Sequence, residues 1–273
     1  MIRQRPLEEE SLRIGLSRLI VPSPTLPPAT STNAWLLGTT QKIVVDPAAK
    51  NQAGHEQLGD ALEKHRPSAI FLTHHHNDHI GSVPYLRERY QCPVFAHPET
   101  TKLLPFSIDQ ELQENEILST DSEEWRIYHT PGHAPGHLCL LSEQDRSLVA
   151  GDMVAGEGTI LIQPSEGSIR EYLHSLERLK ALKVFQLLPA HGSPLTDPEN
   201  LLSSYISHRK MRLEQVQGFL TGDAQSTMDI ATKIYTELPK QFLPIAAIQV
   251  ECGLIWLEEE DLAQRVEDYW IRR

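Results

Sequence analysis

The stretch THHHNDHIGS, residues 73–82, places four histidines and one aspartate within the seven positions from Thr73 to His79. It follows the apolar run SAIFLT, residues 68–73, whose composition predicts a buried β-strand. In α/β folds, the loops after such strands carry functional side chains. If the extended backbone continues, His74 and His76 project to the same side. Asp78 and His79 can then turn toward a second group.

Three more residues of metal-ligand type stand beside glycine or proline, where the backbone turns sharply: His133 in TPGHAPGH, Asp152 in AGDM and His191 in PAHG. Neutral imidazole and carboxylate groups bind zinc and similar divalent ions. A lone His133 or His191 would more often be structural, and a lone HHH could be a surface tract. The combination instead favours two ions ~3.5–4 Å apart that share one carboxylate and hold a bridging hydroxide. The predicted ligands are His74, His76, Asp78, His79, His133, Asp152 and His191.

The composition is that of a globular protein of 273 residues with a formal net charge of −12. That charge disfavours broad attraction to nucleic acid or to an anionic membrane. The three cysteines form no CxxC motif, which favours a reducing compartment. The first ten residues, MIRQRPLEEE, are too charged for a secretory signal, and no apolar run of about 18 residues follows. We therefore expect a cytoplasmic protein without a membrane segment.

Short β-rich segments dominate the first two-thirds of the chain, and helical patterns dominate the rest. Strands are predicted at residues 13–21, 33–38, 41–46, 68–73, 93–97, 125–129, 137–141, 147–149 and 184–191, with a hairpin turn at Thr39-Thr40. Helices are predicted at residues 51–66, 169–183, 199–220, 227–238 and 258–271. We place a domain boundary near residue 215, which gives a catalytic domain over residues 1–215 and a small helical domain over residues 216–273.

The order THHHNDH, TPGHAPGH, GDM and PAHG resembles the metallo-β-lactamase-fold hydrolase superfamily over about residues 10–200. The resemblance implies an α/β fold, the four-layer αββα sandwich, with the site at the edge of two sheets. It implies two Zn²⁺ ions per chain, and manganese or iron accept the same ligands. One ion would be held by His74, His76 and His133, and the other by Asp78, His79 and His191, with Asp152 bridging.

Asp46, which closes IVVD, matches the first motif of this superfamily. There it implies a residue that orients a ligand histidine from outside the metal shell. The alternative is a simple turn aspartate at the end of a strand. True β-lactamases of this fold typically have a cysteine where Asp152 stands, lack a histidine at His79, and are exported, so lactam hydrolysis is disfavoured.

The ligand set resembles instead the glyoxalase II-type thioesterases and the phosphodiesterase and nuclease branches. The segments GDMVAGEGT, PAHGSPLTDP and YISHRKMRLEQV are similar to the β-lactamase-like endoribonucleases, which append a winged-helix-like C-terminal domain. The segment SPTLPPATSTNAWLL, residues 23–37, departs from the Gly-rich and Asn-Thr-Tyr pattern usual there. Since that segment would border the substrate cleft, the resemblance leaves the substrate open.

Charge argues against RNA, because residues 221–273 hold ten acidic and five basic residues. Such a domain is better suited to pack on the catalytic domain, line the cleft or form a homodimer contact. One basic helix face remains, on which His208, Arg209 and Arg212 could meet an anionic substrate group. A solvated or domain-bridging face is the alternative.

Two classes of function follow. The first is a metal-dependent hydrolase whose bridging hydroxide attacks an ester-type bond while Asp78 or Asp152 orients the nucleophile. Motif order ranks a phosphodiester of single-stranded RNA slightly above a small-molecule ester or thioester, the glyoxalase II-like alternative. The second class is a non-catalytic scaffold whose acidic tail binds a protein. It is disfavoured because all seven ligands are present.

Overall fold

The computed structural model describes residues 6–273, so residues 1–5 of the predicted N-terminal segment lie outside the described residues. The chain forms two compact units, and each is described by itself. The first unit takes in the chain up to Thr130, Gly136–Ile160 and Lys183–Pro198. The second takes in Pro131–Pro135, Leu161–Leu182 and Glu199–Arg273. Because the second unit draws on three segments, a single boundary near residue 215 stays a prediction.

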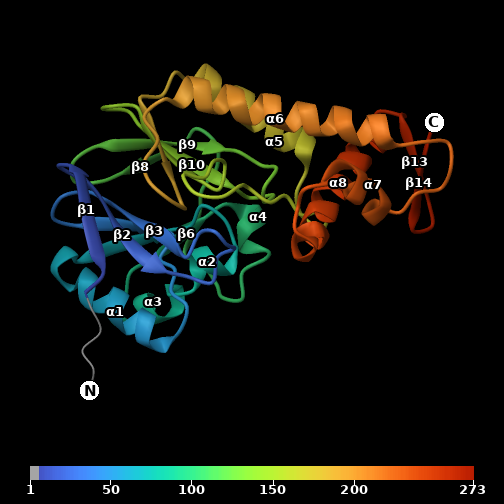
Figure 1. Ribbon diagram of the computed structural model, residues 1–273. Helices are drawn as coiled ribbons and strands as arrows, with labels where there is room; N and C mark the ends of the chain where they lie inside the picture. The colour runs from blue at the N-terminus through green and yellow to red at the C-terminus, as the bar shows by residue number, and fades with distance from the viewer. Residues whose placement is uncertain (1–5) are drawn as a thin grey trace. The chain divides into compact units, whose positions relative to one another are not determined.

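The first sheet of the first unit has seven strands in the order β1 to β7. They are β1 Glu8–Arg13, β2 Leu16–Pro22, β3 Ser31–Leu37, β4 Lys42–Val45, β5 Pro67–Phe71, β6 Val94–Ala96 and β7 Gln110–Glu111. Strands β1 to β4 are antiparallel neighbours, whereas β4 to β7 run parallel (Figure 1). The strand predicted over residues 13–21 is interrupted, since Gly15 turns the chain with a φ of 79° between β1 and β2.

The second sheet has five strands in the order β12-β11-β10-β9-β8. They are β8 Ile117–Ser119, β9 Glu124–His129, β10 Leu138–Ser142, β11 Ser147–Gly151 and β12 Gln186–Pro189. Only the pair β11 and β12 is parallel among these described strands. The parallel pair ends at Gly151 and Pro189, just before Asp152 and close to His191. Two predicted ligands therefore leave the sheet at one edge.

Alternating side chains build two layers of apolar core. From β3, Trp35 and Leu37 pack with Trp125 and Leu140 of the second sheet, which joins the two sheets face to face. From the same strand, Ala34 and Leu36 point to the opposite face. Burial of one such large apolar side chain stabilises the fold by about 1.5–3 kcal/mol. The predicted α/β fold with two sheets is therefore confirmed.

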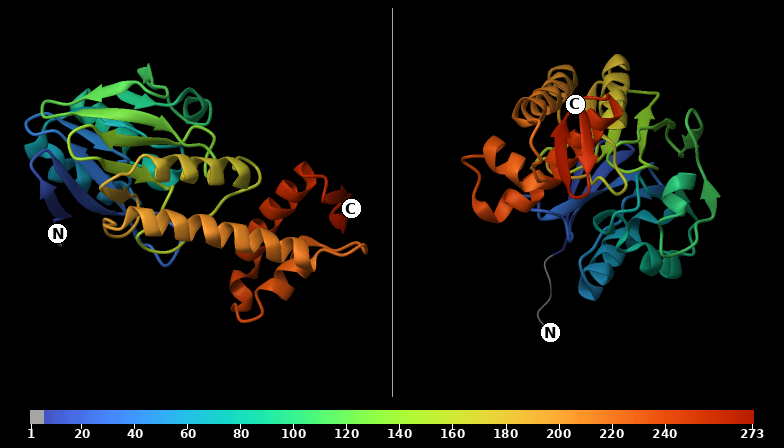
Figure 2. Two further views of the ribbon diagram at one scale, coloured as in Figure 1. Left: turned by 90° about the horizontal axis from the view of Figure 1, so that it is seen from above. Right: turned by 90° about the vertical axis from the view of Figure 1, so that its right-hand side faces the viewer.

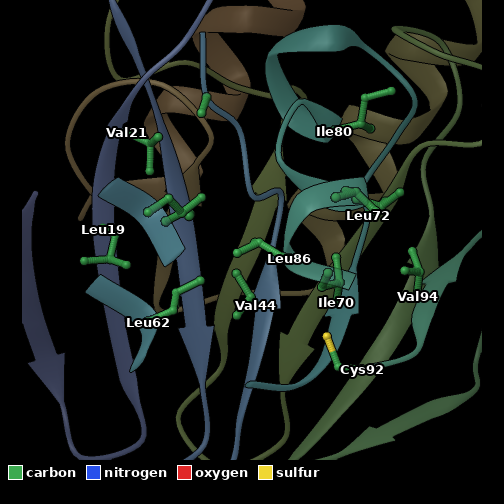
Figure 3. Close-up of a cluster of buried hydrophobic side chains, with 14 of the residues drawn as sticks. Leu19, Val21, Val44, Leu62, Ile70, Leu72, Ile80, Leu86, Cys92 and Val94 are labelled. Atoms are coloured by element: carbon green, nitrogen blue, oxygen red, sulfur yellow. The ribbon is translucent and has the colours of Figure 1, made fainter. Parts of the chain in front are cut away.

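Helices connect strands β4 to β7 of the first sheet, and the longest of them cover its outer face. They are α1 Gln52–Leu62, the short η1 Glu63–His65, α2 Asn77–Ile80, α3 Val83–Tyr90 and α4 Pro98–Thr101. Asn51 caps α1 by accepting the N–H of Gly54. Figure 3 shows Leu62 and Leu86, from α1 and α3, among Leu19, Val44 and Ile70 of the strands. The packing of these helices holds β5 in place, and the histidine segment follows β5 directly in the chain.

The second unit is mainly helical and ends in a hairpin. Its elements are α5 Ile169–Ala181, α6 Pro198–Phe219, α7 Thr227–Ile234, η2 Lys240–Phe242, α8 Leu243–Glu259, β13 Ala263–Val266 and β14 Tyr269–Arg272. Figure 2 shows α6 as one continuous helix, and its residue Val216 and the following Leu220 pack against α7 and α8. None of the helices in residues 6–273 is both long and apolar enough to span a membrane.

The helix predicted over residues 258–271 is wrong. The last helix, α8, ends at Glu259, and residues 263–272 form the β13–β14 hairpin around the buried Trp270. Asp261 and Glu267 adopt left-handed backbone angles, with φ of 59° and 56°, which end the helix and turn the hairpin. The helical character of this region is confirmed, and its assignment as a winged helix stays a prediction.

Candidate metal centre

The chain leaves β5 at Phe71 and brings His74 and His76 together before α2 begins. His74 is fully buried, and its Nδ1 lies 2.9 Å from the hydroxyl of Thr73. Its Nε2 lies 2.9 Å from Nδ1 of His76. Two nitrogens that bind one zinc ion at 2.0–2.1 Å would be about 3.3 Å apart in a tetrahedral site. The pair therefore stands near the spacing that one shared ion requires.

His79 lies in α2 and is completely buried. Its Nδ1 lies 2.9 Å from Oδ2 of Asp46 and donates to that carboxylate. Its Nε2 is buried and has no hydrogen-bond partner among residues 6–273, and it lies 3.6 Å from Oδ2 of Asp152 and 4.0 Å from Oδ1 of Asp78. A buried polar atom without a partner is costly, and a cation between these groups would satisfy it.

Asp46 follows β4 in a left-handed conformation, with a φ of 52°, which aspartate tolerates better than most residues. Its Oδ1 accepts the backbone N–H of Thr73 at 2.8 Å, and its Oδ2 accepts the Thr73 hydroxyl at 2.7 Å. One carboxylate thus holds both the start of the histidine segment and the ring of His79.

Asp152 follows β11 through Gly151, which has a φ of 48°. A Cβ at Gly151 would lie 2.5 Å from Nε2 of His137, so glycine is required where the chain passes this ring. Nε2 of His137 accepts the backbone N–H of Asp152 at 3.1 Å, and its Nδ1 lies 2.8 Å from the hydroxyl of Thr130. His137, which lies outside the predicted ligand set, therefore fixes the backbone from which Asp152 projects.

His191 follows β12 and directs its two nitrogens to different partners. Its Nδ1 donates to the carbonyl of Ser31 at 2.9 Å. Its Nε2 lies 3.5 Å from Oδ2 of Asp78, 3.5 Å from Oδ1 of Asp152 and 3.4 Å from the hydroxyl of Thr25. Nε2 is thus the atom of His191 that faces the two carboxylates.

The electrostatics of the centre favour a cation. Burial acts to raise the pKa of Asp78, but His79 and His191 outweigh it and hold that pKa well below its usual range. Burial acts to lower the pKa of His79, but the carboxylates of Asp46, Asp152 and Asp78 outweigh it and raise that pKa. The pKa of His191 is raised in the same way by Asp78 and Asp152. The carboxylates therefore attract positive charge, which protons or metal ions can supply.

Two sets of donor atoms in the first unit suit metal ions. The ligand atoms of His74, His79 and Asp152 lie within 4.8 Å of one another, and so do those of Asp78, His79 and His191. Imidazole and carboxylate donors of this kind match zinc, manganese and iron. The described structure thus brings six of the seven predicted ligands to one place in the first unit.

The seventh predicted ligand, His133, lies in the second unit, within the segment Pro131–Pro135. Its Nδ1 donates to the carbonyl of Leu161 at 2.8 Å, which makes Nε2 the nitrogen suited to bind a metal. Gly132 before it has a φ of 128°, and a Cβ there would lie 2.2 Å from the backbone nitrogen of Tyr172. Glycine is therefore required for the close packing that presents His133.

The predicted substrate-binding residues on α6 have structural partners. Arg209 is buried, donates to Oε1 of Gln249 at 2.7 Å and lies over the ring of Tyr172, 5.2 Å from its centroid. Arg212 donates to Oε1 of Gln215 at 2.7 Å and lies over the ring of Tyr235. Burial, followed by Arg212 and Arg209, lowers the pKa of His208. Their role in binding a substrate stays a prediction.

Apart from Asp46, the residues that orient the ligands through hydrogen bonds are not predicted from the sequence. Thr73 is part of the histidine stretch, and Ser31 and Thr32 precede the apolar run AWLL. The available signal was a polar triplet, STN, at the start of an otherwise apolar strand. A loop or turn before a strand gives the same short polar cluster, so the triplet by itself does not indicate a site.

Comparison with known proteins places these features in a wider group. A sequence profile of the Metallo-beta-lactamase superfamily matches residues 27–191. The Beta-lactamase-like protein 2 homolog of Drosophila melanogaster is 30% identical over 267 residues, which cover 91% of this chain and 89% of the fly protein. The Atrochrysone carboxyl ACP thioesterase of Aspergillus fumigatus is 30% identical over 189 residues, which cover 68% of this chain and 58% of the fungal protein.

Among solved structures, a Beta-lactamase domain protein from Burkholderia ambifaria matches with a TM-score of 0.85 at 21% sequence identity. The match covers 100% of this chain and 96% of that chain. At this level of identity the likeness is one of fold. It confirms the fold class that the sequence predicts.

Proposed function

The chain belongs to the metallo-beta-lactamase superfamily, and from this premise we propose that it hydrolyses acyl thioesters at a two-metal centre. The observation that carries the proposal is the set of ligand atoms around His79, where Asp78, Asp152 and His191 converge on one place. Asp152 shares one group of ligand atoms with His74 and lies 3.5 Å from His191, which suits a carboxylate shared by two ions. We assign the first ion to His74, His76 and His133, and the second to Asp78, His79 and His191.

The assignment of His133 rests on the family resemblance and on chain connectivity. Residues 131–135 leave the first unit at Thr130 and return to it at Gly136. Within that unit the N–H of Thr130 donates to the carbonyl of His137 at 2.9 Å, which closes the base of the loop. His133 is therefore tethered on both sides, three residues from each of Thr130 and Gly136.

Each side chain of the centre has a task in hydrolysis. When bound, the two ions would supply Lewis acidity and a water that ionises near neutral pH. Asp78 and Asp152 would orient that water and accept its proton, because their oxygens face the same side as Nε2 of His191. Asp46 keeps the proton of His79 on Nδ1, so that Nε2 presents its lone pair. No nucleophilic serine or cysteine is required.

Three observations support a thioester above RNA, which reverses the order that the motifs favour. The fungal thioesterase is one of the relatives, and its name states a thioester of an acyl carrier protein as its substrate. Arg209, one of the residues predicted to meet an anionic substrate group, is buried and bonded to Gln249, so it is poorly placed to follow a phosphate backbone. The net charge of −12 acts in the same direction. Single-stranded RNA remains the second candidate, on the similarity of segment order alone.

A parallel assay tests the proposal. The zinc-loaded protein is given three substrates in separate reactions: an acyl-pantetheine thioester, a single-stranded RNA and a phosphodiester dye. The thiol that thioester hydrolysis releases is detected with a disulfide dye. We expect turnover of the thioester and a loss of at least ~100-fold in the Asp152→Ala and His76→Ala variants. Cleavage of RNA without thioester turnover would reverse the ranking. Unchanged thioester turnover in both variants would contradict the site.

A further inference from the structure

We propose that Ser31, Thr32 and Asn33, the first three residues of β3, form a positioning element that sets the affinity of the second ion. The proposal rests on the two-metal centre proposed above, but it concerns metal binding and not the substrate. Each of the three residues contacts a different part of the chain that carries Asp78 or His191. The three are called the STN element below.

Ser31 acts through its backbone. Its carbonyl accepts Nδ1–H of His191 at 2.9 Å. This bond fixes the tautomer, because a proton on Nδ1 leaves the Nε2 lone pair to face Asp78 and Asp152. A hydrogen bond of this kind also fixes the ring orientation of a metal-binding histidine.

Thr32 acts through its side chain. It is fully buried, and its hydroxyl donates to the carbonyl of Asp78 at 2.8 Å. The same hydroxyl oxygen lies 2.7 Å from that of Ser23, which is also buried. This contact joins β3 to the first turn of α2, where Asp78 lies beside His79. Loss of the hydroxyl would leave the Asp78 carbonyl without this donor in a buried place.

Asn33 holds the segment around His191. Its side-chain amide donates to the carbonyls of Pro189 at 2.9 Å and Gly192 at 2.8 Å, and its backbone N–H donates to that of Ala190 at 2.7 Å. Residues on both sides of His191 are thus bonded to one asparagine. This side chain is almost fully buried, and the bonds close a polar network inside the fold.

Two neighbours of Asn33 complete the network. The guanidinium of Arg18 donates to Oδ1 of Asn33 at 3.1 Å and to the carbonyl of Gly192 at 2.6 Å. The indole N–H of Trp35 donates to the carbonyl of Pro189 at 3.2 Å. Gly192 itself has a φ of 83°, and a Cβ there would lie 2.5 Å from the backbone of Gly156. The segment from Pro189 to Gly192 therefore has little freedom to shift while Asn33 is in place.

The STN element contacts other ligands than Thr73 and Asp46 do. His74 is paired with Thr73, and His79 with Asp46. The STN element contacts Asp78 and the His191 segment, which both belong to the second ion position. Groups that orient ligands from outside the metal shell typically change metal affinity by about 10–100-fold when removed. We therefore expect its loss to weaken one ion selectively.

Stepwise titration of the metal-free protein with Zn²⁺, followed by calorimetry, tests this inference without a substrate. The binding event that disappears in Asp78→Ala marks the second position. Thr32→Val and Asn33→Ala should weaken that event by about 10–100-fold and leave the other event unchanged. Thr32→Ser keeps the hydroxyl and should retain the wild-type affinity for the second ion. Thr39→Val is the matched control and should leave both binding events unchanged. It removes the hydroxyl of a threonine in the β3–β4 turn, and this hydroxyl bonds Asp121 and none of the predicted ligands.

The outcomes separate the inference from the proposed function. Wild-type affinity for both ions in Thr32→Val and Asn33→Ala would overturn the inference, and so would an equal weakening of both ions. Circular dichroism of the metal-free variants checks their folding, and if Asn33→Ala fails to fold, Thr32→Val decides alone. A protein that turns over RNA instead of thioesters would contradict the proposed substrate and leave this result standing.

Discussion

The carboxylate of Asp46 lies 2.9 Å from Nδ1 of His79, and both side chains are almost completely shielded from solvent. Both Asp46 oxygens are already engaged by Thr73, through its N–H at 2.8 Å and its hydroxyl at 2.7 Å. In Asp46→Asn the remaining oxygen would be held by the Thr73 N–H, so the new NH₂ group would face His79. His79 would then carry its proton on Nε2, where a metal ion should bind.

We therefore expect Asp46→Asn to lower zinc affinity by about 10–100-fold while the protein stays folded. Nitrogen NMR of the metal-free protein, at a pH at which His79 is neutral, should report its proton on Nδ1 in the wild type and on Nε2 in the variant. The control is Asp121→Asn, which changes a carboxylate that caps the β3–β4 turn through Thr39 and Thr40. Unchanged zinc affinity together with an unchanged tautomer would show that Asp46 does not set the protonation of His79.

Metal removal should destabilise the first unit. Three carboxylates, those of Asp46, Asp78 and Asp152, surround the buried His79, and two ions would compensate their charge. A ligand present at 1,000 times its dissociation constant stabilises the native state by about 4 kcal/mol. We expect chelation to lower the melting temperature, and re-addition of Zn²⁺ to restore it, as measured by scanning calorimetry. Melting that does not respond to chelator or to zinc would argue against a metal in this centre.

The ring of His97 provides a pH-dependent contribution to stability that does not involve the metal centre. It stacks on His129, with ring centroids 4.1 Å apart, and its Nδ1 accepts the N–H of Glu99 as the cap of α4. Burial, followed by the charge of His129, lowers the pKa of His97 to about 4. The unfolded chain binds this proton near pH 6.5, so the stabilisation is complete above that pH and is lost as the pH falls toward 4.

His97→Asn keeps a cap acceptor and removes the titration. Between pH 6.5 and 4.5 the wild type should lose more unfolding free energy than this variant, because only the wild type has a titrating ring at this position. We expect the difference to be about 1–2 kcal/mol, a value kept small because the ring is only partly desolvated. Urea denaturation of the metal-free proteins at several pH values measures the difference. His174→Asn, at an exposed position of α5, is the control and should follow the wild type. Parallel pH profiles of His97→Asn and the wild type would contradict the prediction.

The sequence predicts those parts of the fold whose signals are local. The strand before His74 and the helix over residues 169–183 are predicted from apolar runs and helical spacing, and the structure confirms both, with the helix at Ile169–Ala181. Six predicted ligands also meet in the first unit, because each follows a strand end at a glycine, a proline or the histidine stretch itself. Turn chemistry and residue type together therefore predict which side chains converge, and their binding of metal stays a prediction.

The parts that the sequence does not predict depend on contacts distant along the chain. Helix α8 contains Pro244 and Gly253 and is apolar on most of its faces, so it has no clear helical period. The hairpin that follows it is defined by the packing of Trp270 against α7 and α8, which only the folded unit provides. The residues that orient the ligands are equally distant along the chain. Thr32 bonds Asp78, which lies 46 positions away, and Asn33 bonds Pro189, which lies 156 positions away.

Arg209 should contribute to stability and not to substrate affinity. Its guanidinium is buried between Oε1 of Gln249 and the ring of Tyr172, and Gln249 in turn donates to the carbonyl of Ile162 at 2.7 Å. Arg209→Ala would leave that amide oxygen without this donor and open a space within the second unit. We expect it to lower the free energy of unfolding by about 2–4 kcal/mol. At a temperature where the variant is folded, its KM for a thioester should change less than twofold.

The neighbouring cation Lys210 is the matched control, because it is exposed and pairs with Glu177 at the surface. Lys210→Ala should change stability by less than about 0.5 kcal/mol. Urea denaturation and steady-state kinetics of both variants separate the two roles, since a structural contact changes the first and a substrate contact changes the second. A large rise in KM for Arg209→Ala, with stability preserved, would instead place its guanidinium on the substrate, as the basic face of α6 predicts.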